Sequence, residues 1–339
     1  MFRSVLLTLI ALTIAACSRD EPAPQAPGDT LTPALAALAE KAMPGTLAVS
    51  VLDLETGQAR GINSKKPMPM QSVFKLPLGI MVLDQVDKGE IKLDEKIVLT
   101  ADQLSTPHSP IADAFPGRQE YTIEQLIRAA ISESDNTAAD ILLKRIGGPE
   151  ALTRFIQDRG IKSFRLDRFE YELQPQAAGL PPFTHQWIGT KAFMDAVGKV
   201  PMEARQAAMR IYLADPRDRV APDDATQILA LLGKGKLLSP ASTAKIMEML
   251  KGTVTGAARL KAGVPQGAIV YHKTGAGPTV EDVNSASNDV GIIELADGRK
   301  LAVAVFFSGS TATPEQRDTI IAEVARLATS ELAGKPAVP

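Results

Sequence analysis

Residues 290–307 decide the fold class; they read Val290-Gly-Ile-Ile-Glu-Leu-Ala-Asp-Gly-Arg-Lys-Leu-Ala-Val-Ala-Val-Phe-Phe307. Two apolar runs, 290–295 and 301–307, flank a short segment that contains Asp297-Gly298. Asp-Gly between two such runs is a strong hairpin signal, because these residues tolerate the backbone conformations of a tight reversal. The stretch therefore predicts two antiparallel strands near the end of the chain.

Further strands are predicted on both sides of the long middle of the chain. Residues 268–273 predict one strand shortly before the hairpin, and residues 47–51 and 59–62 predict another hairpin near the start. Between them, apolar residues recur at helical spacing from residue 72 to about residue 250. We therefore expect an α/β fold of the α+β type: an antiparallel sheet built from both chain ends, with flanking helices and an inserted all-helical lobe.

The two lobes have approximate boundaries in the sequence. The sheet lobe is expected at about 34–70 and 255–334, and the helical lobe at about 71–254. The first helix of the sheet lobe is predicted at 34–42 and its last helix at 314–333. A small-molecule cleft is expected between the lobes, since such sites favour the junction of two folded parts.

The first 33 residues have the features of a targeting segment and a linker. Arg3 is positively charged, and the apolar run 5–14 is too short to span a bilayer as a mature helix. The run leads into Cys17 through small residues and resembles a bacterial lipobox, in which Cys17 is lipidated; an ordinary signal peptide cut just before Cys17 is the alternative. Residues 18–33 contain four prolines and predict a disordered tether.

Composition restricts the classes of function. The chain has 339 residues, 45% of them hydrophobic, and a net charge of −2, so it can bury a sizeable core and has no general attraction for nucleic acid. Cys17 is the only cysteine, which leaves the body without a disulfide framework or a thiolate metal site. His108, His185 and His272 are far apart and form no H-x-H pair. We expect no metal, no cofactor and a monomer that acts on a small molecule.

The first of three short motifs is Ser72-Val-Phe-Lys75. A spacing of three on a helix places both side chains on one face. A serine needs a neighbouring base to become a nucleophile, and Lys75 is a candidate if a nearby cation such as Lys273 lowers its pKa. Taken alone, the motif favours a surface serine and lysine on a helix, because both residue types are common there.

Two further motifs follow, at 134–136 and 273–275. Ser134-Asp-Asn136 is suited to cap a helix, or to relay a proton and bind a substrate amide through Ser134 and Asn136. Lys273-Thr274-Gly275 ends a strand; it is a solvated turn, or a site where Lys273 and Thr274 bind a carboxylate. The N–H groups of Ala276 and the motif serine would then form an oxyanion hole.

The three motifs occur together in the order used by class A serine β-lactamases and penicillin-binding proteins. The chain resembles class A from about residue 34 to residue 332. Residues 165–173 resemble the entry to the Ω loop of that family, and residues 215–218 resemble its exit, with Arg168 and Asp218 as the ion pair at the loop neck. The resemblance implies the same fold and a β-lactam substrate.

Glu170 separates the two branches of the resemblance. It matches the carboxylate that activates the hydrolytic water in β-lactamases, which penicillin-binding proteins lack. The resemblance therefore implies a β-lactamase that forms an acyl-enzyme on Ser72 and contributes to antibiotic resistance. Together with the N-terminal segment, it leads us to expect a periplasmic enzyme that is lipid-anchored at Cys17. A D-alanyl-D-alanine peptidase and a penicillin-binding sensor are the alternatives, and the base for acylation, Lys75 or Glu170, stays open.

Several positions depart from the usual pattern of the family. Gln174 stands where an asparagine usually holds the deacylation water, and Val290 stands where many members have a carboxylate-binding arginine. Arg259 matches an arginine that supplies this guanidinium from another element in other members. His108 stands where an aromatic residue often flanks the cleft; an ordinary exposed loop residue is the other interpretation.

The chain between Gln174 and Asp218 is much longer than the Ω loop usually is. We call residues 174–218 the extended Ω segment; together with the loop entry, the predicted Ω region spans about 165–218. Two helices are predicted in it, at 191–200 and 202–213, and its apolar residues indicate that it packs. Because long loops in compact domains are often functional, the hypothesis is a helical flap at the cleft that tunes substrate size.

Overall fold

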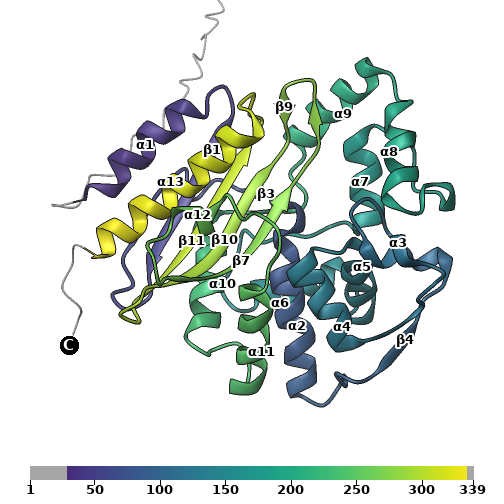
Figure 1. Ribbon diagram of the computed structural model, residues 1–339, viewed down its shortest axis with the longest axis horizontal. Helices are drawn as coiled ribbons and strands as arrows, with labels where there is room; N and C mark the ends of the chain where they lie inside the picture. The colour runs from purple at the N-terminus through teal and green to yellow at the C-terminus, as the bar shows by residue number, and fades with distance from the viewer. Residues whose placement is uncertain (1–28, 334–339) are drawn as a thin grey trace, which may run out of the picture.

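A five-stranded antiparallel sheet forms the centre of one lobe (Figure 1). The structure is a computed structural model that describes residues 29–333, and its strand order is β2-β1-β11-β10-β7. The five strands are β1 (Thr46–Asp53), β2 (Ala59–Ile62), β7 (Ile269–Ala276), β10 (Ser287–Glu294) and β11 (Lys300–Ser308). The paired register runs from Ser287 opposite Phe307 to Glu294 opposite Lys300, which confirms the hairpin predicted at Asp297-Gly298. Strands from both chain ends therefore share one sheet, as predicted.

Alternate residues of the strands face opposite sides of this sheet. Val49, Val303 and Val305 pack against α1 (Leu31–Lys41) and α13 (Pro314–Ala333), which lie side by side over the outer face in Figure 1. Their neighbours Ala48, Ala304 and Phe306 face the helical lobe instead and join its core. This period of two explains why nearly every residue of the central strands is buried.

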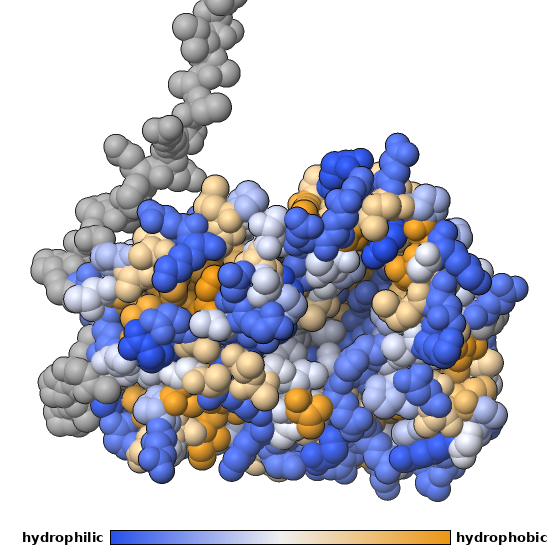
Figure 2. Space-filling model, turned by 45° about the horizontal axis from the view of Figure 1, so that its top comes forward, coloured by the Kyte–Doolittle hydropathy of each residue, from blue (hydrophilic) through white to orange (hydrophobic). Residues whose placement is uncertain are grey.

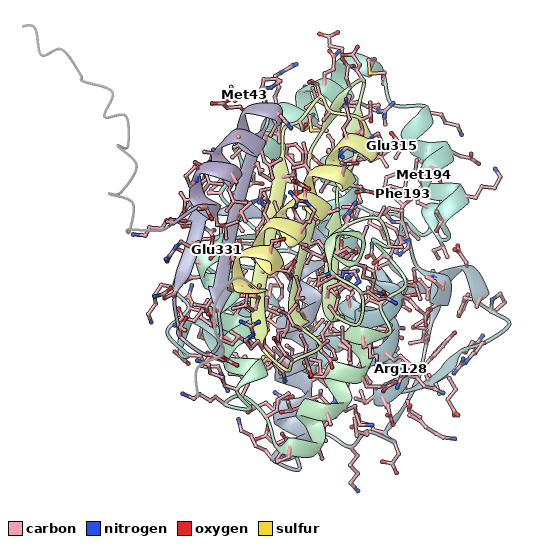
Figure 3. The ribbon with its side chains drawn as sticks, turned by 60° about the vertical axis from the view of Figure 1, so that its left-hand side comes forward. Met43, Arg128, Phe193, Met194, Glu315 and Glu331 are labelled. Carbon is pink, nitrogen blue, oxygen red and sulfur yellow. The ribbon has the colours of Figure 1, made fainter. Side chains whose placement is uncertain are left out.

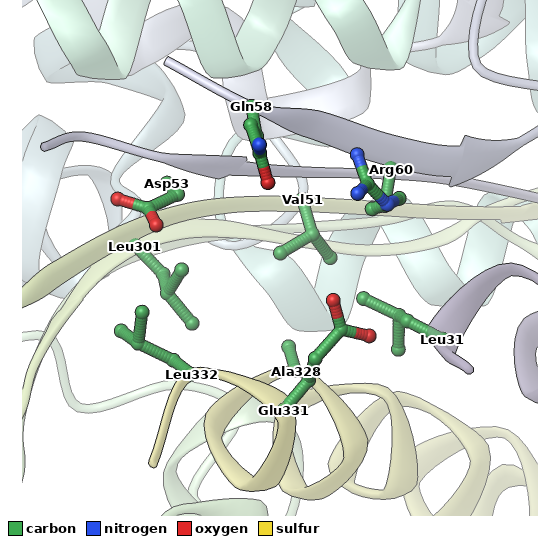
Figure 4. Close-up of a pocket in the computed structure, with 9 residues that line it drawn as sticks. All are labelled: Leu31, Val51, Asp53, Gln58, Arg60, Leu301, Ala328, Glu331 and Leu332. Atoms are coloured by element: carbon green, nitrogen blue, oxygen red, sulfur yellow. The ribbon is translucent and has the colours of Figure 1, made fainter. Parts of the chain in front are cut away.

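The first and last helices, α1 and α13, pack against each other on the outer face. Strand β1, strand β11 and helix α13 enclose a small cavity of about 20 Å³, with Arg60 and Glu331 on opposite sides of it (Figure 4). Met43 follows the C-terminal end of α1, and Glu315 lies in the first turn of α13, so these two ends of the antiparallel helices are neighbours (Figure 3). The helix predicted at 34–42 begins earlier, at Leu31, where the carboxylate of Asp29 accepts hydrogen bonds from Thr32 N (3.1 Å) and Oγ1 (2.7 Å).

The predicted tether 18–33 was therefore too long at its end, since residues 31–33 are helical. Cys17 and the rest of the predicted signal peptide lie outside the described residues. Within the described part of the chain, no helix combines the length and the apolar character needed to span a membrane.

The second lobe consists mainly of short helices between the two groups of strands. Its elements, with the connections that follow, are β3 (Met68–Pro69), η1 (Gln71–Phe74), α2 (Lys75–Asp87), β4 (Lys96–Val98), η2 (Ala101–Gln103), α3 (Pro110–Ala114), β5 (Glu120–Thr122), α4 (Ile123–Arg128), η3 (Ala129–Glu133), α5 (Asn136–Arg145), α6 (Pro149–Gln157), α7 (Glu170–Ala178), η4 (His185–Trp187), α8 (Thr190–Gly198), α9 (Met202–Ala214), β6 (Arg219–Val220), α10 (Pro222–Gly233), α11 (Pro240–Lys251), α12 (Leu260–Gly263), β8 (Thr279–Val280) and β9 (Val283–Asn284).

Helix α2 is the centre of this lobe. It is buried from Lys75 to Leu83 with no exposed stripe, as expected for a helix that is apolar on all sides. The motif at 72–75 lies at its N-terminal end, so that motif is attached to a buried helix of the second lobe.

The extended Ω segment is folded, and its two predicted helices are observed as α8 and α9 (Figure 1). Phe193 is buried against Trp187 and Val197, whereas its neighbour Met194 is 54% exposed (Figure 3). On the face shown in Figure 2, apolar side chains form small separate groups among polar ones.

Candidate active site

Ser72 lies in η1, a single 3₁₀ turn that precedes α2. The helix itself begins at Lys75, one turn later than the motif alone predicted. Residues i and i+3 are eclipsed in a 3₁₀ turn, so Ser72 and Lys75 face the same side. The preceding residue, Gln71, has a left-handed backbone (φ 46°), a conformation that is rare for a residue with a side chain.

Lys75 has its ammonium group among oxygen atoms of three other residues. Its Nζ donates to the carbonyl oxygen of Ser134 at 2.7 Å and to Oδ1 of Asn136. It also lies 3.2 Å from Oε1 of Glu170, and both side chains of this pair are inaccessible to solvent. Lys75 therefore joins the serine turn, the second motif and the Ω region at one point.

Lys273 reaches the same centre from β7. Its Nζ donates to Oγ of Ser134 at 2.9 Å and to the carbonyl oxygen of Thr274 at 3.0 Å. Burial, together with the positive charge of Lys75, holds the pKa of Lys273 well below its ordinary value. The sequence named Lys273 as the candidate cation near Lys75, and the structure brings the two side chains to the same centre, where both contact Ser134. An amine of this kind can exchange a proton with the Ser134 hydroxyl.

Ser134 and Asn136 flank the start of α5. Ser134 has a left-handed backbone (φ 62°), and Asp135 caps the helix by accepting from Ala138 N at 2.8 Å. The capping interpretation of this motif is therefore correct for Asp135, while its two neighbours direct polar groups at Lys75 and Lys273.

Glu170 is the first residue of α7 and is 1% exposed. Besides its contact with Lys75, its Oε2 accepts a hydrogen bond from Nε2 of Gln174 at 2.7 Å, one helical turn later. A buried carboxylate beside a buried ammonium group can accept a proton from a water molecule or a hydroxyl.

The neck of the Ω region contains the predicted ion pair. Arg168 Nε lies 2.6 Å from Asp218 Oδ2, and Asp218 also accepts from the backbone N–H groups of Asp167 and Arg168. Arg168 Nη1 lies 3.2 Å from Asp215. The entry and exit of the region are thus tied together next to Glu170.

Asp140 is a component that the sequence did not reveal. Its carboxylate accepts from Ser105 Oγ (2.6 Å), Glu170 N (2.8 Å) and Tyr171 N (3.0 Å), so it caps α7 from the neighbouring helix α5. Burial, followed by the charge of Glu170, raises the pKa of Asp140 to about 7. Its position four residues after Asn136, on the same helix face, was the available signal.

A pocket of about 300 Å³ opens above these groups. It is lined by Ser72, Pro107, His108, Ser134, Asn136, Gln174, Thr255, Gly256, Arg259, Thr274 and Ala276. Lys75, Glu170 and Lys273 lie beneath it, fully buried. Among the described residues, none of the pocket's lining comes from 180–214, so the structure does not place α8 and α9 as a flap over the cleft.

Arg259 and His108, two residues that the sequence assigned to substrate binding, lie at the rim of the pocket. Arg259 is held by Asp318 (Nε to Oδ1, 2.8 Å) and by the carbonyl oxygen of Asn288 (2.9 Å from Nη1), which fixes a guanidinium at the cleft. His108 is exposed, has φ 56°, and its Nε2 lies 2.9 Å from the carbonyl oxygen of Glu133. Val290, in contrast, is 1% exposed and belongs to the apolar core.

A buried histidine–aspartate pair supports the strand that carries Lys273. His272 Nδ1 lies 2.8 Å from Asp289 Oδ1, and Leu260 N donates to the other oxygen of Asp289 at 3.2 Å. The pair joins β7, β10 and α12. Within residues 29–333, no group of three or more His, Cys, Asp or Glu side chains is arranged to hold a metal ion.

Comparison with known proteins gives consistent matches over most of the chain. Residues 30–332 match the model of a family described as the β-lactamase enzyme family. The chain is 31% identical over 288 residues to β-lactamase VEB-1 of Pseudomonas aeruginosa, with 85% of each chain covered. It is 33% identical over 269 residues to extended-spectrum β-lactamase PER-1 of Pseudomonas aeruginosa, covering 79% of this chain and 76% of that protein. One solved structure is a class A β-lactamase described as that of the last common ancestor of Gram-negative bacteria. It is 34% identical to this chain, the TM-score is 0.73, and the match covers 90% of this chain and 100% of that structure.

Proposed function

Because this chain belongs to the β-lactamase enzyme family and is a class A serine β-lactamase, we propose that it opens the lactam ring through an acyl-enzyme on Ser72 and releases the product with water activated by Glu170. Hydrolysis of β-lactams, a route to antibiotic resistance, is the activity of this family.

Acylation forms a bond between Ser72 Oγ and the lactam carbonyl carbon and breaks the ring C–N bond. The hydroxyl proton goes to Lys75 or, through water, to Glu170; both are buried beside the serine turn, and both remain candidates. The hydroxyl of Ser134 delivers a proton to the leaving nitrogen and is replenished through Lys273, 2.9 Å away. The N–H groups of Ser72 and Ala276 stabilise the oxyanion.

Substrate binding uses the groups at the opposite rim. Lys273, Thr274 and Arg259 bind the substrate carboxylate, since an ammonium, a hydroxyl and a guanidinium are suited to this anion. Asn136 binds the side-chain amide of the substrate. His108 flanks the entrance to the cleft, and Gln174 holds the deacylation water beside Glu170.

The observation that carries the proposal is the position of Glu170. It is 1% exposed, 3.2 Å from Lys75 and 2.7 Å from Gln174, in contact with the amine that also faces the serine turn. A carboxylate at this place gives the acyl-enzyme a base for hydrolysis. A penicillin-binding sensor or a D-alanyl-D-alanine peptidase would acylate with β-lactams and stop there.

The test replaces Glu170 by Gln, which removes the base and keeps the shape. With a chromogenic cephalosporin, the wild type should turn over continuously, whereas Glu170→Gln should give one stoichiometric burst and an acyl-enzyme visible in the intact mass. Glu172→Gln is the matched control on the same helix and should turn over like the wild type. Sustained turnover by Glu170→Gln would contradict the role of Glu170, and a burst by the wild type would favour the sensor or the peptidase.

The substrate range is a separate part of the proposal. The relative PER-1 is described as an extended-spectrum enzyme, and residues 71–76, 272–275 and 288–289 resemble that branch. We therefore propose that extended-spectrum cephalosporins are among the substrates. The ratio kcat/KM for a panel of penicillins, cephalosporins and carbapenems tests this, and activity confined to penicillins would contradict it.

We also propose that the enzyme is a periplasmic monomer with a lipid anchor at Cys17. Metabolic labelling with a fatty acid should label the wild type, whereas Cys17→Ser should remain unlabelled. An unlabelled wild type that is cut just before Cys17 would instead show an ordinary signal peptide. Size-exclusion chromatography of the soluble domain measures the oligomeric state.

A further inference from the structure

The extended Ω segment reaches the nucleophile from behind the cleft. Helix α9 packs against α7 and approaches β8. Tyr212 of α9 is 6% exposed and packs against Leu173 and Ala177 of α7. Its hydroxyl oxygen accepts a hydrogen bond from Nε2 of Gln71 at 2.5 Å. The contact therefore connects a helix of the extended segment with the residue directly before Ser72.

A continuous chain of hydrogen bonds leads from this contact to Glu170. Gln71 is 1% exposed, and its Oε1 accepts from Nε2 of Gln174 at 3.3 Å. The same Nε2 donates to Oε2 of Glu170 at 2.7 Å. Since Gln71 has one end of its amide on Tyr212 and the other on Gln174, the tyrosine hydroxyl fixes an amide that in turn contacts the partner of Glu170.

Burial also restricts what Tyr212 can do chemically. It raises the pKa of the phenol, so Tyr212 stays neutral and acts only as a hydrogen-bonding group. It lines no part of the cleft pocket and cannot touch a substrate there. The influence of its hydroxyl on the reaction has to pass through Gln71, the side chain that donates to it.

We propose that Tyr212 is a positioning residue for deacylation: its hydroxyl anchors Gln71, and Gln71 and Gln174 then hold the Glu170 carboxylate in its reactive orientation. This inference rests on the proposed role of Glu170 in hydrolysis of the acyl-enzyme. It gives the extended Ω segment a role as a support behind the catalytic residues, in place of the flap over the cleft that its length had suggested.

The test is Tyr212→Phe, which removes one oxygen and keeps the ring packed on α7. Pre-steady-state kinetics with a cephalosporin separate acylation from deacylation. We expect the rate of deacylation to fall about tenfold and the rate of acylation to change less than about threefold, so the acyl-enzyme accumulates. Ile211→Ala, at the neighbouring exposed position of α9, is the matched control and should leave both rates unchanged.

A second variant distinguishes positioning from a general loss of structure, because the hydrogen bonds lead from the Tyr212 hydroxyl to Glu170 through Gln71 and Gln174. Gln71→Leu should slow deacylation similarly, and the double variant should be no slower than either single one, because both changes break the same chain. Gln71→Leu also serves as the test if Tyr212→Phe does not fold.

The outcomes separate the two proposals. If Glu170→Gln accumulates acyl-enzyme but Tyr212→Phe deacylates like the wild type, the positioning role of Tyr212 is wrong and the proposed function stands. Equal slowing of acylation and deacylation, or a lower Tm with unchanged rates, would also overturn the positioning role. If Glu170→Gln still turns over, the proposed function itself fails.

Discussion

Asp215 closes the extended Ω segment, and replacing it by Asn should destabilise the protein in a pH-dependent way. Its carboxylate accepts hydrogen bonds from Arg217 N (3.0 Å), Nε (3.0 Å) and Nη2 (2.7 Å), and it lies 3.2 Å from Nη1 of Arg168. Burial alone would raise the pKa of Asp215; the hydrogen bonds from Arg217 and the charge of Arg168 outweigh it and bring the pKa to about 2.

The magnitude follows from the difference between this pKa and the ordinary value of 3.8. Full conversion of that difference gives about 2.4 kcal/mol of folding free energy at neutral pH. The side chain of Arg217 is 38% exposed, so solvent screening reduces the expected contribution to about 1–2 kcal/mol. The pKa of Asp215 is lower in the folded protein than in the unfolded chain. Its contribution to stability is therefore present above pH 4, falls to about half near pH 3 and is lost below pH 2.

Urea denaturation at pH 7, 4 and 3 measures the effect. Trp187 is the only tryptophan and lies in the extended segment, so its fluorescence reports that segment while circular dichroism reports the whole chain. Asp195→Asn is the control; its pair with Lys191 is exposed on both sides and should contribute less than about 0.5 kcal/mol. The reasoning is refuted if Asp215→Asn is as stable as the wild type at pH 7, or if its deficit stays constant down to pH 3.

Three further predictions concern the core, a close helix contact and the cleft. Phe306→Ala removes a fully buried ring between the sheet and the helical lobe and should cost about 3–5 kcal/mol in urea denaturation. Gly263→Ala should lower Tm markedly, because the added Cβ would lie 1.8 Å from the carbonyl oxygen of Ala322 and force α12 away from α13. Arg259→Lys should raise KM about tenfold for substrates with a free carboxylate and change kcat little, since one ammonium replaces a two-pronged donor; an unchanged KM would place the carboxylate elsewhere.

The sheet and the main motif residues could be predicted because their signals are local. The hairpin at Asp297-Gly298 needs only two alternating runs and a turn, and the period of two then assigns each residue of β11 to one face. The cluster of Ser134, Lys75 and Lys273 could be predicted because each motif carries its own spacing, and the resemblance supplied their relative order.

The supporting contacts could not be predicted, because they join residues that no local pattern connects. Tyr212 and Gln71 are 141 positions apart, and Asp140 reaches the N–H of Glu170 across 30 positions. Neither pair has a spacing that implies contact. The lowered pKa of Lys273 could not be predicted either, because its main cause is burial, which is known only once β7 and α5 are packed together.

The neck explains how the chain accommodates a long segment beside a catalytic carboxylate. Arg165 and Arg219 exchange backbone hydrogen bonds of 2.9 Å in both directions, and Arg168 pairs with Asp218, so the segment leaves and returns at one place. The entropic cost of closing a loop grows only slowly with its length, so extra helices between fixed ends cost little once they bury their own apolar faces. Glu170 lies at this fixed entry, as the first residue of α7, so the length of the segment does not set its place in the chain fold. Because the ends are fixed, a helix between them can contact Gln71, as Tyr212 of α9 does, and this is the contact through which we propose that the segment supports Glu170.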